Sequence, residues 1–316
     1  MSSIKVFLKD QYFALLNIFD GDDLFYQLGK PLILNYHHII PDSRVENNLL
    51  FGYAHSTTSF ESQIKWLAQH FRKSQDFDTQ NSFVITFDDC SQHTFELALP
   101  VLEKYGMKAY FFMVENTIGT TIWIDRYFFW LSYAPTAKYH LFDKEYTLDN
   151  HKSRIAAHHK LWSLYESNIE YSEILDEMEK AYPFSNLETD SNRLEKRLNT
   201  LSIEQCNSLK EQGHFIGFHS RNHEQLSKLT KNKLKLECEP QEKSLYNSNT
   251  FAIPFGGSND YDQSVLQEIK KGGFDSILLN HPIRAKDNVF GRLNLPDTSN
   301  PLAIQYYVKR YLKSIA

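Results

Sequence analysis

Short apolar runs recur along the chain, and between them the apolar residues are spaced as in helices. The runs are nearly continuous and rich in β-branched or aromatic residues, and they cover residues 32–36, 83–87, 109–113, 215–218, 250–255 and 276–280. Such runs are typical of strands that are buried on both faces, as in a parallel sheet or barrel. They predict a parallel arrangement rather than an antiparallel sheet with one wet face.

Helical spacing between the runs predicts helices over residues 59–71, 94–106, 201–213 and 261–273. We expect Ser59 and Ser202 to cap the first and third of these helices, and Gly106 and Gly213 to end the second and third. Strands that alternate with helices in this way indicate an α/β fold. The predicted architecture is a distorted or incomplete (β/α) barrel of about seven parallel strands.

One region interrupts the alternation and suggests how the chain is divided. Residues 123–200 contain no convincing strand and read as a helical insertion after the third strand. We therefore expect an N-terminal helical extension over 1–30, the first part of the barrel over 31–122, and its second part over 201–316. The apolar run near the N-terminus is broken by polar residues and followed by acids, so it favours an amphipathic helix over a signal peptide.

Composition narrows the functional classes. The chain has 316 residues, 41% of them hydrophobic, and a formal net charge of -5 with no long basic run, which argues against nucleic acid as a partner. Three cysteines argue against a disulfide framework. No stretch approaches the ~20 apolar residues that span a bilayer. We expect a cytoplasmic enzyme without a transmembrane segment, and leave open its oligomeric state and a peripheral membrane contact through the first helix.

Polar side chains follow two of the predicted strands directly. Asp88 and Asp89 end the strand at 83–87, and His219 and His223 follow the strand at 215–218. The carboxyl ends of parallel strands gather at one face of an α/β fold, so these four side chains should meet there. A helical turn after the strand at 215–218 would place both imidazoles on one side. Two histidines and one carboxylate form a common zinc set that leaves a coordination position open.

The order of three motifs resembles a known family. The sequences "ITFDD" at 85–89, "HSRNH" at 219–223 and "FAIPFGG" at 251–257 are similar to the motifs of the polysaccharide deacetylases, carbohydrate esterase family 4 with the NodB-homology domain. The likeness runs from about residue 31 to 296 and begins with "ILNYHHI" at 33–39. The helical insertion resembles the members of this family that act in surface-polysaccharide biosynthesis.

The resemblance implies a role for each matching residue. Asp89, His219 and His223 would bind a divalent metal, most simply zinc, and Asp88 would be the general base that activates water. The backbone N–H of Phe255 would stabilise the oxyanion. Zinc lowers the pKa of water to about 7, which makes such a mechanism work near neutrality.

The chain also departs from the family pattern. The arginine that precedes the third motif and pairs with the base is replaced by Ala252, and Arg292 in "GRLNLPD" is the candidate substitute. The D-x-x-D-W motif is missing, since no Trp follows Trp162. The late L-x-H motif has only a weak counterpart in "LNH", which ends at His281.

Other residues allow two interpretations each. Of the adjacent His37 and His38, one should face the pocket and contact the substrate, and we favour His37. Cys90 follows the two carboxylates as a nucleophile would, but with activated water available a packing role is favoured. The aromatic segment 123–130 belongs either to the core or to the rim of a sugar-binding site, because aromatic faces stack on sugars.

These expectations converge on a metal-dependent N-deacetylase, a hydrolase of carbon–nitrogen bonds other than peptide bonds. Its substrate would be an N-acylated sugar of a glycan or glycolipid precursor. One alternative is a deformylase or another C–N hydrolase that acts on a lipid-linked or non-sugar amide. A second alternative is a catalytically silent glycan-binding protein on the same fold, although such a protein has no need of Asp88.

Overall fold

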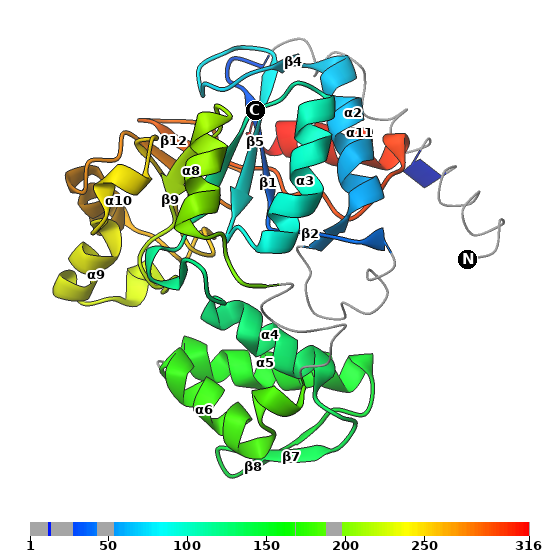
Figure 1. The fold of residues 1–316 in the computed structure, drawn as a ribbon, viewed down its shortest axis with the longest axis vertical. Coiled ribbons are helices and arrows are strands. Elements are labelled where there is room, and N and C mark those ends of the chain that lie inside the picture. The colour runs from blue at the N-terminus through cyan, green and yellow to red at the C-terminus, as the bar shows by residue number, and fades with distance from the viewer. Residues whose placement is uncertain (1–11, 14–27, 43–53, 168, 188–197, 316) are drawn as a thin grey trace.

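A computed structural model describes residues 12–13, 28–42, 54–167, 169–187 and 198–315. These residues form a barrel of strands and helices, shown in the upper part of Figure 1, and a smaller lobe below it. The predicted N-terminal helical extension falls almost entirely on residues outside this description. Phe13, which is described, packs its ring against Tyr306 and Tyr307.

Seven parallel strands build the barrel in the order β1, β5, β6, β9, β10, β11 and β12. Their bounds are β1 Leu32–Tyr36, β5 Ser82–Asp88, β6 Ala109–Met113, β9 Phe215–Phe218, β10 Thr250–Ala252, β11 Ser276–Leu279 and β12 Val289–Gly291. A short strand β4, Arg72–Lys73, adds to β5 outside this ring. A separate pair, β2 His38–Ile40 and β3 Ala54–Ser56, follows the end of β1.

The two ends of this strand order meet just beyond β12. Leu293 pairs in parallel with Leu34 of β1, its N–H donates to the Ile33 carbonyl at 2.8 Å, and its own carbonyl accepts from the Asn35 N–H at 3.0 Å. The pairing of strands is less extensive between β9 and β10, which share the single residue pair Phe218 and Phe251. The predicted distorted (β/α) barrel is therefore confirmed, and it is nearly closed.

Helices cover the outside of the barrel and use the caps that the sequence indicates, with one correction. They are α2 Thr57–His70, α3 Gln92–Lys104, α8 Ile203–Glu211, α9 Lys231–Cys238, α10 Gln263–Lys271 and α11 Pro301–Ile315. Ser202 caps α8 in a capping box with Gln205, as predicted. The prediction of Ser59 as the cap of α2 was wrong, because Ser56 accepts from the Ser59 N–H and the helix begins directly after β3.

The lower lobe is the insertion, and it is not purely helical. It contains α4 Trp123–Tyr133, α5 His151–Glu166 and α6 Tyr171–Ala181, as well as the strands β7 Lys138–Leu141 and β8 Lys144–Thr147. The two strands pair in an antiparallel hairpin, so the expectation of a strand-free insertion was wrong. Phe142 and Asp143 form its turn with φ of 50° and 56°. Such left-handed turns match the twist of short hairpins, and although Asp is common in them, Phe142 gives no signal of one.

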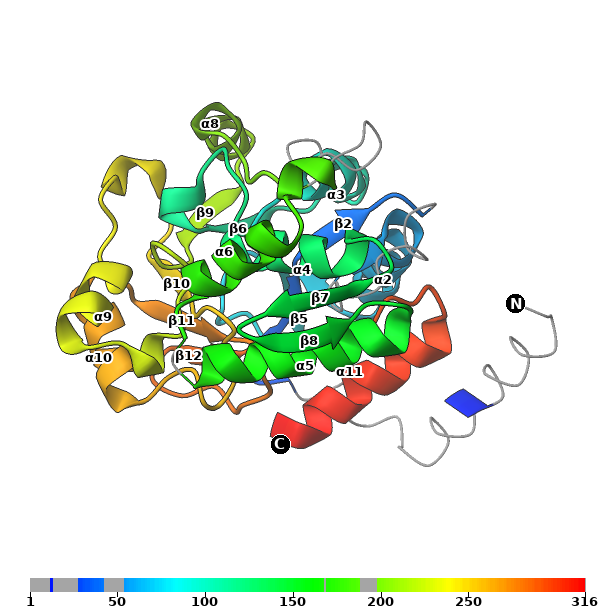
Figure 2. The ribbon, with the colours of Figure 1, turned by 90° about the horizontal axis from the view of Figure 1, so that it is seen from below.

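The insertion has a buried core of its own, which includes Trp130, Leu141, Tyr146, Leu161 and Met178. Seen from below, its helices and hairpin lie in front of the strands, on the side of their carboxyl ends (Figure 2). The proposed division at residues 31–122, 123–200 and 201–316 stays a prediction, and this separate core supports it.

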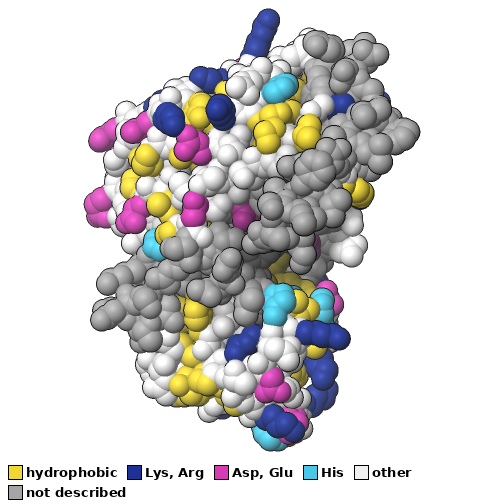
Figure 3. All heavy atoms as spheres, turned by 90° about the vertical axis from the view of Figure 1, so that its right-hand side faces the viewer, with side chains coloured by type: hydrophobic (Ala, Val, Ile, Leu, Met, Phe, Trp, Pro, Cys, Tyr) yellow, Lys and Arg dark blue, Asp and Glu magenta, His cyan; other side chains and the backbone are white. Residues whose placement is uncertain are grey.

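The surface that faces the viewer in Figure 3 mixes charges of both signs. Acidic and basic side chains are interspersed over the barrel lobe and the insertion lobe of the described residues. Within the described part of the chain, every helix is too short or too polar to cross a bilayer. The cytoplasmic location expected from the sequence stays a prediction.

A buried histidine at the amino end of β9 should make the fold sensitive to acid. His214 is 1% exposed, and its Nδ1 accepts a hydrogen bond from the Ala109 N–H at 3.1 Å. Burial, with a contribution from the neighbouring Lys108, lowers the pKa of His214 to about 4. Between this pKa and the ordinary value near 6.5, the unfolded chain binds a proton that the folded chain does not, so stability falls as the pH falls.

For this residue alone, we expect the free energy of unfolding to decrease by about 2 kcal/mol between pH 7.5 and pH 5. The variant His214→Asn keeps an acceptor for the Ala109 N–H and cannot titrate. Its free energy of unfolding should therefore decrease less between the two pH values, by the amount that His214 contributes. Urea unfolding of both proteins at the two pH values measures the difference. Equal losses would show that His214 is not a linked group.

Candidate metal centre and active site

Asp88 and Asp89 occupy a sharp reversal of the backbone at the carboxyl end of β5. Asp89 and the following Cys90 have left-handed φ values of 63° and 55°, which residues other than glycine rarely adopt. The chain therefore turns within two residues, and both carboxylates lie at the same end of the barrel, 1% and 4% exposed. Cys90 Sγ lies 3.4 Å from the carbonyls of Phe87 and Phe112, in a packing position.

The histidine loop after β9 reaches the same place by a different route from the one expected. Residues 219–223 do not form a helical turn; Ser220 and His223 adopt left-handed φ values of 63° and 59°. The Ser220 hydroxyl accepts from the His223 N–H at 3.0 Å and holds the bend. The rings of His219 and His223 nevertheless lie together, with their centroids 5.0 Å apart.

Three side chains offer a set of metal ligands. The Nε2 atoms of His219 and His223 each lie 3.5 Å from Asp89 Oδ1, and one donor atom from each of the three residues falls within 4.8 Å of the others. His219 Nδ1 lies 2.7 Å from the Ala252 carbonyl, an acceptor, so this nitrogen carries the proton and Nε2 presents a lone pair. Asp89 Oδ1 is buried and has no hydrogen-bond partner among the described residues.

The electrostatics of this set fit a divalent cation. Burial lowers the pKa of His219 and of His223, so both imidazoles are neutral, the form that binds a metal. Burial, Asp125 and Asp88 together raise the pKa of Asp89 well above its ordinary value. A positive ion between Asp89 and the imidazoles would offset this penalty, because the site otherwise crowds buried acidic groups.

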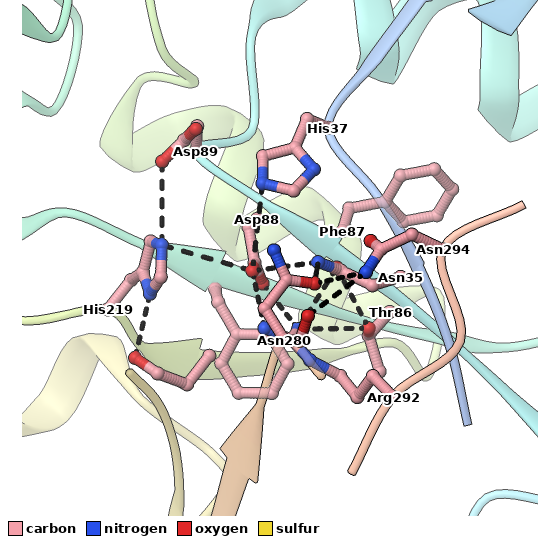
Figure 4. A network of polar contacts seen from close by, with 12 residues as sticks. Asn35, His37, Thr86, Phe87, Asp88, Asp89, His219, Asn280, Arg292 and Asn294 are labelled. Carbon is pink, nitrogen blue, oxygen red and sulfur yellow. Dashed lines mark hydrogen bonds and ion pairs between the residues drawn. The ribbon is translucent and has the colours of Figure 1, made fainter. Parts of the chain in front are cut away.

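Asp88 is held apart from the ligand set by an arginine from the far end of the chain. Arg292 donates from Nη1 to Asp88 Oδ1 at 2.7 Å and from Nη2 to Oδ2 at 2.6 Å, and Asn35 Nδ2 donates to Oδ2 at 3.1 Å (Figure 4). Burial alone would raise the pKa of Asp88, but the ion pair with Arg292 outweighs it and brings the pKa below its usual range. Asp88 is therefore an anion within reach of the metal ligands.

A polar network inside the barrel fixes the orientation of Arg292. Its Nη1 also donates to Asn35 Oδ1 at 3.0 Å and to Thr86 Oγ1 at 3.2 Å, and its Nε donates to the Leu279 carbonyl at 3.2 Å. Asn280 Oδ1 accepts from Asn35 at 3.0 Å. Sequence reasoning missed Asn35, Thr86 and Asn280. A usable signal existed, since Thr86 lies two residues before Asp88 and so on the same face of the strand.

The remaining candidate residues lie at different distances from this centre. His37 Nε2 is 4.0 Å from Asp88 Oδ2, and burial lowers the pKa of His37 to about 3. His38 Nε2 lies instead 3.0 Å from Asp125 Oδ1, in the first turn of α4. The ring of Phe255 packs 4.7 Å from that of His223. His281 turns its Nδ1 to the Gly256 carbonyl at 2.8 Å and lies outside the ligand set.

The aromatic segment of α4 belongs mainly to the core of the insertion, where Trp123, Tyr127, Phe129 and Trp130 are buried. Trp123 also reaches the barrel, because its indole Nε1 donates to the His223 carbonyl at 3.1 Å. Around it, Trp162, Tyr165 and Phe255 form a group of stacked and tilted rings beside the histidine loop. The insertion therefore forms part of the wall of the site.

The family model described as polysaccharide deacetylase matches residues 76–277, a span that includes the two aspartates, the histidine loop and Phe255. The chain belongs to the polysaccharide deacetylase family, whose members are generally metal-dependent.

Several curated proteins that are similar to this chain are named as N-deacetylases of one polymer. Poly-beta-1,6-N-acetyl-D-glucosamine N-deacetylase of Staphylococcus aureus (strain MSSA476) is 31% identical over 114 residues, which are 30% of this chain and 39% of the relative. The enzyme of the same name from Staphylococcus epidermidis (strain RP62A) is 32% identical over 124 residues, which are 32% of this chain and 42% of that protein. The alignments thus span about two fifths of these relatives.

Solved structures share the fold at low sequence identity. The deacetylase PplD of Streptococcus pyogenes superposes with a TM-score of 0.53 at 14% identity, covering 87% of this chain and 96% of that one. IcaB from Ammonifex degensii superposes with a TM-score of 0.50 at 16% identity, covering 91% and 98%. At this identity the likeness establishes the architecture alone.

A three-ligand site holds about one zinc ion per chain. His223→Ala should lower the zinc content of the purified protein well below this value. The imidazole is one of only three donors in the set, so its loss leaves too few ligands. Elemental analysis after dialysis against zinc-free buffer measures the change. His281→Ala is the matched control and should keep the wild-type content, whereas unchanged zinc in His223→Ala would exclude this ligand set.

Proposed function

We propose that this protein is a metal-dependent N-deacetylase that hydrolyses the N-acetyl group of a sugar in a glycan or glycolipid precursor. The observation that carries the proposal is the juxtaposition of the Asp89, His219 and His223 donor set with a second carboxylate, Asp88, that is ion-paired to Arg292. A binding protein has no use for a buried anion held beside a metal site, whereas hydrolysis needs one to accept a proton.

Each residue would contribute one function to the reaction. Asp89, His219 and His223 would hold a divalent cation, most simply zinc, which supplies Lewis-acid chemistry by acidifying a water molecule and polarising the amide carbonyl. Asp88 would accept the proton of the attacking water. Arg292 keeps Asp88 charged and in place, because it donates to both carboxylate oxygens and lowers the pKa of this group.

Two further residues beside the site would contact the substrate. The backbone N–H of Phe255 would donate to the oxygen of the tetrahedral intermediate. Removing such a donor typically raises the activation free energy by roughly 3 kcal/mol. His37, whose Nε2 lies 4.0 Å from Asp88 Oδ2, would contact the scissile amide. The C–N bond then breaks as the nitrogen takes up the proton that was removed from water, and acetate and the sugar with its free amine leave.

The names of the curated relatives point to the substrate class. Those proteins are N-deacetylases of poly-β-1,6-N-acetylglucosamine, and we propose an N-acetylglucosamine-containing glycan for this chain as well. The runner-up activity, cleavage of a formamide or another amide, would use the same metal set and the same base. The acyl product distinguishes the two activities.

The test is acetate release by zinc-loaded protein from β-1,6- and β-1,4-linked N-acetylglucosamine oligomers, with free amine quantified in parallel. We expect acetate and amine in equal amounts, loss of both after chelation, and recovery when zinc is added back. Formate release from N-formylated oligomers without acetate release would favour the runner-up. A zinc-replete protein that releases no acid from any of these substrates would overturn the proposed function.

A further inference from the structure

Glu237, in α9, is a buried carboxylate that serves the histidine loop. Glu237 is only 3% exposed to solvent. Its Oε2 accepts from the backbone N–H groups of Arg221 at 3.2 Å and Asn222 at 2.9 Å. Its other oxygen, Oε1, accepts from Asn222 Nδ2 at 2.5 Å. One carboxylate therefore receives three donors from Arg221 and Asn222, two of the three residues that lie between His219 and His223.

These contacts act at the part of the loop where the backbone is most unusual. Ser220 and His223 are both left-handed, and the two residues between them direct successive N–H groups at the same oxygen of Glu237. A carboxylate is suited to this task, since it accepts several hydrogen bonds at once and charge-assisted bonds are stronger than neutral ones. Glu237 thus holds the loop in a path that its own residue types do not favour.

The opposite side of the loop is held by segments that follow β6. Glu115 N–H donates to the Ser220 carbonyl at 3.1 Å, and Asn116 N–H donates to the Arg221 carbonyl at 3.0 Å. The Arg221 side chain is largely buried, with Nε 2.8 Å from the Glu239 carbonyl and 3.7 Å from a carboxylate oxygen of Glu115. The loop is therefore clamped between Glu237 on one side and the 115–116 backbone on the other.

A buried carboxylate is costly unless its oxygens are satisfied, so its presence outside the ligand set needs an explanation. We propose that Glu237 is a positioning residue of the metal centre, which fixes the 219–223 loop so that both imidazoles converge on Asp89. This inference rests on the proposed function. Residues that act through metal ligands in this way typically change metal affinity by 10–100-fold when they are replaced.

The test measures metal binding rather than turnover. Zinc affinity of the full chain is determined by competition with a chromophoric chelator, and the visible spectrum of the cobalt-loaded protein reports the ligand geometry. We expect Glu237→Ala to bind zinc about 10–100-fold more weakly and to change the cobalt spectrum. The matched control is Glu239→Ala, which removes a carboxylate two residues away. Among the described contacts, Glu239 meets the loop only through its backbone carbonyl, which alanine keeps. This variant should therefore bind zinc as the wild type does.

Glu237→Gln keeps the inference testable if the alanine variant does not fold. Its amide oxygen can still accept the two backbone N–H groups but meets Asn222 Nδ2 with an NH2 group, so we expect an intermediate affinity. Wild-type affinity and spectrum in either folded Glu237 variant, or an equal loss in Glu239→Ala, would overturn the positioning role alone. A wild-type protein that does not bind zinc would instead overturn the proposed function, and this inference with it.

Discussion

Asp88→Asn is expected to lose about three orders of magnitude in kcat for deacetylation while it binds zinc at the wild-type stoichiometry. Asparagine has nearly the shape of aspartate, and its oxygen can still accept from Arg292, but it cannot take a proton from water. The metal ligands are unaffected because Asp88 lies outside their set. Steady-state kinetics with an N-acetylglucosamine oligomer and elemental analysis of the same sample measure both quantities.

Asp89→Asn is the matched control for this experiment, since it changes the adjacent carboxylate in the same way. It should lose zinc together with activity, because Asp89 contributes a donor atom to the set. The two variants then separate proton transfer from metal binding. Turnover by Asp88→Asn within tenfold of the wild type would remove Asp88 from the role of general base.

Arg292→Leu is expected to lower the free energy of unfolding by about 3–5 kcal/mol and to abolish most of the activity. Arg292 is 1% exposed and donates to both oxygens of Asp88, so its removal leaves a buried carboxylate without its cation. The pKa of Asp88 should rise in this variant, since Arg292 is the main group that lowers it. The remaining activity should therefore need a higher pH, where Asp88 is still ionised.

Urea unfolding at pH 7.5 measures the loss of stability, and the pH dependence of kcat/KM measures the shift of the acidic limb. The double variant Asp88→Asn/Arg292→Leu removes the uncompensated charge as well. It should regain a large part of the lost stability and remain inactive. A single Arg292→Leu variant within ~0.5 kcal/mol of the wild type would show that the pair contributes little to the fold.

The barrel strands could be predicted from the sequence because of where they lie. A strand covered on both faces is apolar at nearly every position, so β1, β6 and β9 appear as nearly continuous apolar runs with the bounds that the structure has. The β7–β8 hairpin left no such trace. Its strands have four residues each, and its turn places the bulky Phe142 beside Asp143, without the glycine that would make a hairpin turn easy to recognise.

The candidate site was predictable to the extent that strand ends determine it. Asp88, Asp89, His219 and His223 all follow strands, and the parallel arrangement brings them together. The path of the histidine loop was not predictable, because left-handed Ser220 and His223 depend on contacts with α9 and the segment after β6. Ala252 acts on His219 through its carbonyl, a group that every residue carries, so no sequence pattern could reveal it.

The closure of the barrel at Leu34 and Leu293 also has a consequence for the chain during its synthesis. Asp88 is charge-paired with a residue 204 positions later, whereas the last of the three candidate metal ligands, His223, is added much earlier. Because the barrel closes only through Leu293, a chain still being synthesised contains the three candidate ligands before it contains the arginine that pairs with Asp88, and a domain folds as a unit. Hydrolytic competence should therefore arise only after the twelfth strand has emerged from the ribosome and docked beside the first.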